Sequence, residues 1–201
     1  MKKTEIILIS LAIIALIMRL FDIPSHGALW VLSLSILSII YFNFGFALFN
    51  NLRLRNILKK ESYIGISQGR IIGAIGTGLA LSLSSIGILF RFQSYPGSKP
   101  MLMIGLFGMA IVTITAVIKN RGTTDNFYTN ILKRIAIYVP MVIFLLALPT
   151  KTWMNWKYPD NPEYVQAVLD AQENPESLEL WDKAENEREK MLEERDKEIE
   201  E

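Results

Sequence analysis

The side chains that most often carry out chemistry are sparse in this sequence of 201 residues, and they form no recognisable catalytic pattern. It contains no cysteine, which excludes disulfides, thiolate metal ligands and thiol nucleophiles. The single histidine, His26, stands near Asp22. That spacing would suit a pH-sensitive pair, although a solvated turn residue is the simpler interpretation. Because no nucleophile–base pair or set of metal ligands stands out, we expect neither an enzyme nor a bound cofactor or metal.

Long apolar runs surround these few polar groups and define the class of protein. Runs of this length can cross a hydrocarbon core of roughly 30 Å as helices. The first run carries only Arg19, near its end, and the last is short and contains Pro140. We predict an all-α polytopic membrane protein with a transmembrane domain at 1–150. The five expected transmembrane helices are at about 6–21, 28–49, 71–90, 101–118 and 135–148.

The first run has a second interpretation, because two lysines followed by an apolar stretch also describe a secretory signal peptide. Ser25 and Gly27 would then flank a small-residue cleavage site. Arg19 lies between the apolar run and that site, which favours a transmembrane helix that stays in the protein.

The formal net charge of +1 is the sum of two opposite halves. Residues 1–150 carry a net charge of +10, and residues 151–201 carry −9. The basic residues gather in alternate loops, so the positive-inside rule places the N-terminus in the cytoplasm and, with five helices, the C-terminus outside. For a bacterial inner membrane, the acidic tail 151–201 is then expected in the periplasm.

An offset of 72 residues aligns the first hairpin with the second. Arg19 and Pro24 fall on Arg91 and Pro96, and Ser25 falls on Gly97. Each unit is a helix ending in Arg, a short outer turn and a returning helix, which predicts two parallel helical-hairpin repeats. The two arginines are expected to be interfacial anchors; the alternative is that they pair with acids of a partner or line a pathway.

The second unit resembles a known family. Phe90-Arg91-Phe92-Gln93-Ser94-Tyr95-Pro96-Gly97, followed by Met-Leu-Met-Ile-Gly-Leu at 101–106, is similar to the transmembrane hairpin of the gliding-motility L-subunit family of Bacteroidota, with a fainter copy at 18–26. The resemblance implies an inner-membrane component of a proton-driven motor that serves gliding and type 9 secretion. The position of the family's essential Glu falls on Met109, so the resemblance carries over a membrane topology and an envelope role but not the motor chemistry.

Two further features predict contacts within the membrane and at its surface. Small residues at a spacing of four form stripes suited to close helix packing, among them Gly73 with Thr77, and Gly78. Their partner is another helix of the chain or another protein. Asn43, with neighbouring Tyr41, is the most polar group of the second run and is expected to pack across helices.

The loop 50–70 is expected to form a short amphipathic helix on anionic lipid through Arg53, Arg55, Lys59 and Lys60.

The acidic tail contains two helix-start signals, Asn161-Pro162-Glu163 and Asn174-Pro175-Glu176. The second helix is expected from about Pro175 towards Ile199, with ion pairs Glu179–Lys183 and Glu193–Lys197. We expect the tail to be either a solvated helix or a docking arm. In the second case its anchors would be Tyr164, Leu178 and Trp181.

Together these observations predict a non-enzymatic structural or accessory subunit of a cell-envelope complex, with membrane lipids and other membrane or periplasmic subunits as partners. Nucleic-acid binding is not expected, because the basic groups lie next to the membrane. The alternative from another class is a small transporter or channel built from the two hairpins. Such a protein normally carries ionisable groups at depth.

Overall fold

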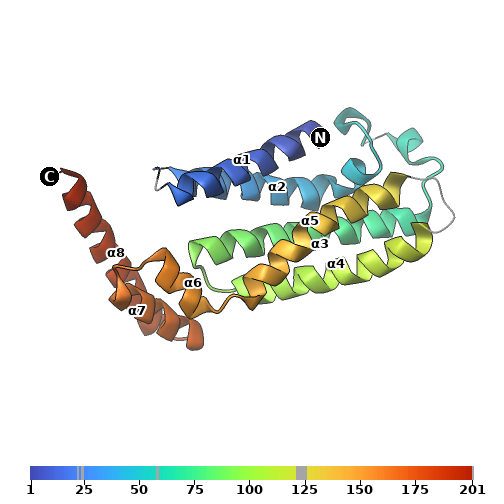
Figure 1. Ribbon diagram of the computed structural model, residues 1–201. Coiled ribbons are helices and arrows are strands. Elements are labelled where there is room, and N and C mark those ends of the chain that lie inside the picture. Colours follow the sequence, from blue (N-terminus) through green and yellow to red (C-terminus); the bar gives the residue numbers. More distant parts are fainter. Residues whose placement is uncertain (22, 24, 58, 121–125, 201) are drawn as a thin grey trace. The chain divides into compact units, whose positions relative to one another are not determined.

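The computed structural model describes residues 1–21, 23, 25–57, 59–120 and 126–200, and all the regular structure in them is helical (Figure 1). The chain divides into two compact units, Met1–Leu146 and Ala147–Glu201. The helices are α1 Lys2–Leu20, α2 His26–Phe49, η1 Leu54–Asn56, η2 Lys60–Tyr63, α3 Gln68–Gln93, α4 Ser98–Asn120, α5 Asn126–Ala147, α6 Thr150–Lys157, α7 Pro162–Glu173 and α8 Leu178–Glu200.

Four of the described helices, α2 to α5, are long and apolar enough to cross a membrane. These four match the second to fifth predicted runs. The helix α1 has 19 residues, but each 18-residue window in it includes Lys3, Glu5 and Arg19. Composition alone therefore does not make α1 a span, and the five-span topology stays a prediction.

The last membrane helix is longer than its apolar run suggested. Whereas the run begins at Ile135, α5 begins at Asn126 and continues through Pro140 to Ala147. A proline removes one backbone donor, and a helix in a membrane tolerates this when its neighbours compensate. As a result, Lys133 and Arg134 lie inside the helix rather than before it.

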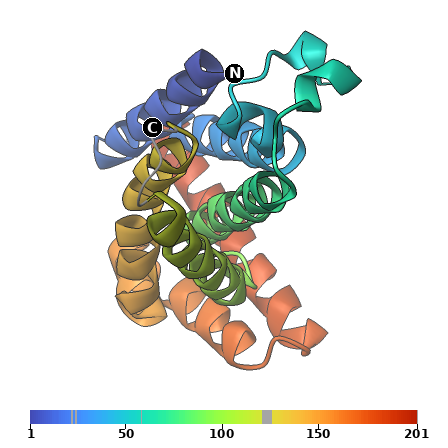
Figure 2. The ribbon, with the colours of Figure 1, turned by 90° about the vertical axis from the view of Figure 1, so that its right-hand side faces the viewer.

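In the first unit, α3 packs between α2 and α4 through small residues (Figure 2). A Cβ built on Gly45 would lie 3.0 Å from Cα of Gly78. On the other side of α3, a Cβ on Gly87 would lie 2.9 Å from the Leu102 side chain. The helix backbones therefore approach closely enough that even a methyl group would clash.

Large apolar side chains cover the outside of the first unit. Several of them are more than half exposed: Ile72, Phe107, Ile114, Ile137 and Phe144. An exposed apolar surface on helices of this length is typical of a protein that contacts lipid. These findings agree with a membrane protein.

Among the described residues, the turn between α1 and α2 and the turn between α3 and α4 share a backbone hydrogen bond and a positive φ at the offset of 72. The amide of Ile23 donates to the carbonyl of Met18 at 2.9 Å, and the amide of Tyr95 donates to that of Phe90 at the same distance. Ser25 (φ 70°) and Gly97 (φ 80°) then precede the returning helices. Of the aligned residues, Pro24 lies outside the described part of the chain.

The connection between α2 and α3 differs from the expected amphipathic helix. Its regular structure, among the described residues, consists of the two 3₁₀ turns η1 and η2. The expected apolar positions were too few to sustain an α-helix, because isolated helices of a few turns are marginal.

The second unit contains α6, α7 and α8, and α7 packs along α8. The signal at Asn161-Pro162 does start α7, with Pro162 in its first turn. The second signal does not start a helix: Asn174 caps the end of α7, and α8 begins at Leu178. The reason is that Ser177 takes the capping role, since its hydroxyl accepts from the amide of Leu180 at 3.4 Å.

Candidate functional site

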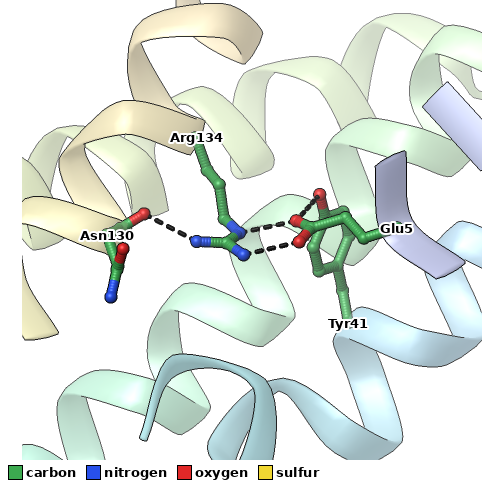
Figure 3. Close-up of polar contacts among 4 residues, drawn as sticks. All are labelled: Glu5, Tyr41, Asn130 and Arg134. Carbon is green, nitrogen blue, oxygen red and sulfur yellow. Dashed lines mark hydrogen bonds and ion pairs between the residues drawn. The ribbon is translucent and has the colours of Figure 1, made fainter. Parts of the chain in front are cut away.

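A buried ion pair connects α1 and α5, the first and last helices of the first unit, Met1–Leu146, which we call the membrane unit from here on (Figure 3). Glu5 of α1 accepts two hydrogen bonds from Arg134 of α5, from Nε to Oε1 and from Nη2 to Oε2, each at 2.5 Å. The side chain of Glu5 is 5% exposed and that of Arg134 is 13% exposed. The two planar groups therefore meet in the bidentate geometry that gives arginine–carboxylate pairs their strength and direction.

Further contacts satisfy both members of this pair. The hydroxyl of Tyr41, on α2, donates to Oε1 of Glu5 at 2.9 Å. Nη1 of Arg134 donates to the carbonyl of Asn130 at 2.8 Å, and the guanidinium lies 5.4 Å from the ring centre of Phe49. A charge in a low-dielectric interior is tolerated when it is paired and hydrogen-bonded, and this arrangement meets both conditions.

Tyrosines extend the polar network from α2 and α5 to α3. The rings of Tyr41 and Tyr138 meet edge to face at 5.9 Å, and the hydroxyl of Tyr138 lies 2.8 Å from that of Ser85. Ser38 and Ser82 make a separate bond of 2.8 Å between α2 and α3. The network thus joins α1, α2, α3 and α5 through specific polar contacts that fix which helix lies beside which.

A second arginine cluster lies where α2 ends and where α3 and α5 begin. Nη2 of Arg70 donates to Oδ1 of Asn50 at 3.2 Å, and its guanidinium lies 4.6 Å from the ring centre of Phe127. Asn50 in turn donates to the carbonyl of Phe46. Both arginine clusters therefore bind the N-terminal half of α5 to the rest of the unit.

The two arginines of the expected repeat lie in different surroundings. Arg91 is 3% exposed, although we expected an interfacial anchor. Arg19 is half-buried, and its Nη1 lies 3.4 Å from Nε2 of His26, whose Nδ1 donates to the carbonyl of Ile23. The expected partner of His26, Asp22, lies outside the described residues.

The small residues of α3 divide between two environments. Gly78 faces α2, where an added Cβ would lie 2.5 Å from the carbonyl oxygen of Tyr41. Thr77 is fully buried and donates to the carbonyl of Gly73 within its own helix. Gly73 itself has open space at its Cβ position. The polar residue singled out on α2, Asn43, is exposed and bonds within its own helix, whereas its neighbour Tyr41 makes the contact across helices.

The three expected anchors of the acidic tail also differ in exposure. Leu178 is 79% exposed. Trp181 is half-buried and donates from Nε1 to the carbonyl of Pro175 at 3.1 Å. Tyr164 is buried against Tyr158, and this burial raises the pKa of its hydroxyl above the usual value. Of the three, Leu178 is the one whose side chain is open to a partner.

The ion pairs on α8 also differ from the expected ones. The structure has Arg188–Glu185 and Lys190–Glu187, each at 2.7 Å and each spaced by three residues. Three of the four side chains are exposed and that of Glu187 is half-buried, so each pair stabilises the helix only slightly. In the connection 50–70 between α2 and α3, Arg53, Arg55 and Lys59 are exposed. The side chain of Lys60 is not among those that the structure describes.

Sequence reasoning missed the central pair of this site. The predicted runs 6–21 and 135–148 begin one residue after Glu5 and Arg134, so neither residue was expected to be buried among the helices. One signal was available: Glu5 is an isolated acid next to Lys2 and Lys3 on the side that the positive-inside rule makes basic. Its partner stands 129 positions away, a distance at which pairing is not visible in a single sequence.

Comparison with known proteins gave no match to a family model, a curated protein or a solved structure. The resemblance to the gliding-motility family therefore stays a prediction.

Proposed function

We propose that this chain is a non-enzymatic subunit of a cell-envelope complex in a bacterial inner membrane, where its helices form a scaffold that presents the acidic helices α7 and α8 to a partner. The observation that carries the proposal is the exposure of Leu178 on a unit with a net charge of −9 over residues 151–201. An exposed apolar side chain on a predominantly acidic unit favours a partner with a basic surface and an apolar pocket.

The proposal includes α1 as a fifth span and two hairpin repeats. The bond between Glu5 and Arg134 supports the first part, because pairing removes most of the cost of placing the carboxylate of α1 in the membrane. The matched turns at Ile23 and Tyr95 support the second. In this topology the N-terminus is cytoplasmic and the tail is periplasmic.

The decisive experiment is purification in mild detergent from the native host, with quantitative mass spectrometry of co-purifying proteins. Leu178→Ala is expected to lower the recovery of one defined partner about fivefold or more, the loss typical of an interface anchor. Leu178→Met, which keeps the apolar surface, is the matched control and is expected to retain the partner. A chain that purifies alone, or equal recovery with both variants, would contradict the proposal.

Topology is tested separately with a periplasm-active reporter fused after Glu201. Activity of this fusion is expected for five spans. A silent periplasmic reporter, together with an active cytoplasmic reporter at the same site, would refute the periplasmic tail.

A transporter or channel is the second candidate, and the ion pair is the observation that favours it, since ionisable groups buried among the helices of a membrane protein often mark ion pathways. Purified protein in vesicles would then raise ion or proton permeability above that of empty vesicles, and Glu5→Gln would abolish the increase. A scaffold is expected to give no such flux.

A further inference from the structure

A cavity of about 330 Å³ lies between the N-terminal end of α1 and the C-terminal end of α2. Figures 1 and 2 both show the start of the chain beside the segment that follows α2. The residues that line the cavity are of two kinds. The cationic side chains of Lys2 and Arg53 line it with Asn51, and Ala47, Leu48 and Leu52 provide apolar surface.

The end of α2 places Arg53 at this cavity. Asn51 adopts a left-handed conformation (φ 57°), and the amide of Leu52 donates to the carbonyl of Ala47 at 2.8 Å. This is the hydrogen-bond pattern with which a chain turns back over the end of its helix. The turn brings Arg53 to the same cavity as Lys2, although 51 positions separate them in the sequence.

Both charged side chains that line the cavity, Lys2 and Arg53, are positive, and the sequence next to them is mostly basic. Lys3 follows Lys2, and the connection 50–70 contains five basic residues and one acid, Glu61. The nearest acid of α1, Glu5, is bound by Arg134. An anion that enters the cavity therefore meets two cations, while the adjacent carboxylate is already neutralised.

We propose that this cavity binds the headgroup of an anionic glycerophospholipid, with the phosphate between Lys2 and Arg53. A lipid fits better than a soluble phosphate because the cavity has apolar lining and exposed apolar side chains follow Lys2 along α1. Ile6 and Ile7 of α1 are 62% and 57% exposed, and they lie about one turn from Lys2. The acyl chains would lie along these residues while the headgroup occupies the cavity.

The test is native mass spectrometry of the full chain in detergent, titrated with phosphatidylglycerol and, separately, with phosphatidylcholine. The wild-type chain is expected to retain one phosphatidylglycerol molecule in preference to phosphatidylcholine. The double variant Lys2→Gln/Arg53→Gln is expected to bind phosphatidylglycerol about 30-fold more weakly, which is the loss of two basic contacts with anionic lipid.

The matched control is Arg55→Gln/Lys59→Gln, which removes the same total charge at exposed residues of the connection 50–70 that lie outside the cavity. This control is expected to weaken binding less than threefold, on the order of the screened surface effect. All four residues are on the surface, so both variants should keep the unfolding midpoint of the wild type.

Three results would overturn the proposal. Equal losses in the two double variants would mean that lipid is attracted by diffuse positive charge and not bound in the cavity. Equal retention of phosphatidylglycerol and phosphatidylcholine would mean that no anionic headgroup is selected. Displacement of the lipid by an equimolar amount of glycerol phosphate would identify a soluble phosphate compound as the ligand. None of these outcomes depends on whether α8 binds a partner.

Discussion

Replacing Arg134 by leucine should severely destabilise the membrane unit, although leucine is the more apolar side chain. The variant removes both guanidinium bonds from Glu5 and leaves a 5% exposed carboxylate with the hydroxyl of Tyr41 as its remaining bond in Figure 3. Breaking a buried pair by removing one partner costs about 3–5 kcal/mol, because the other charge stays buried without compensation. We expect the free energy of unfolding to fall by this amount.

The double variant Glu5→Leu/Arg134→Leu separates two free energies: the cost of burying one unpaired charge, and the net contribution of the intact ion pair to stability. Two apolar side chains in place of a buried ion pair are often neutral or even stabilising. The hydroxyl of Tyr41 would lose its acceptor, at a cost of about 1–3 kcal/mol. We therefore expect the double variant to be more stable than Arg134→Leu alone, with a coupling energy of about 2 kcal/mol or more.

The assay is equilibrium unfolding in mixed detergent micelles, followed by helical circular dichroism, for the wild type, both single variants and the double variant. Lys133→Leu is the control, because Lys133 is the exposed neighbour of Arg134 and its loss should change stability by less than about 0.5 kcal/mol. Single variants that unfold like the wild type, with a coupling energy near zero, would refute the reasoning and mean that the pair is solvated or absent.

Three further predictions test other parts of the molecule by the same unfolding measurement. Gly78→Ala should destabilise the protein by about 1–3 kcal/mol, because the added Cβ meets the backbone of α2. Gly73→Ala has open space at its Cβ position, so it should be neutral or stabilising by up to about 1 kcal/mol. Equal effects of the two variants would refute the packing of α3. Arg70→Met should cost about 1–3 kcal/mol, because it loses both the contact with the Phe127 ring and the hydrogen bond to Asn50, and the exposed Arg55→Met should cost nothing measurable. Burial raises the pKa of Tyr164, so the contribution of its neutral hydroxyl to stability is complete below about pH 10, the unfolded value, and is lost as the pH rises above it. Tyr164→Phe should remove that part of the alkaline loss, and identical pH profiles of helical circular dichroism would contradict the burial.

Where the physics is local, the sequence predicted the structure well. Helices α3 and α4 cover their apolar runs with two or three residues more at each end, and α2 begins two residues earlier and ends where its run ends. A membrane helix needs a continuous stretch of apolar side chains, and the flanking residues complete its last turns. Helix α7 begins at Pro162, as the signal at Asn161 indicates, since proline fits the first turn of a helix and fits its interior poorly. Asn174-Pro175 carries the same letters but does not start a helix, because Ser177 provides the cap three residues later.

The sequence by itself therefore determined an all-helical chain with membrane-length apolar helices and an acidic C-terminal segment, because these properties depend on composition and on neighbours a few positions apart. The tertiary structure decided which small residues are contacts: Gly78 meets α2, whereas Gly73, five positions away, has open space. It also decided that Glu5 and Arg134 are a buried pair. Charge pairing depends on distance in space, and only the packing of α1 and α5 in one unit brings these two residues together across 129 positions of the chain.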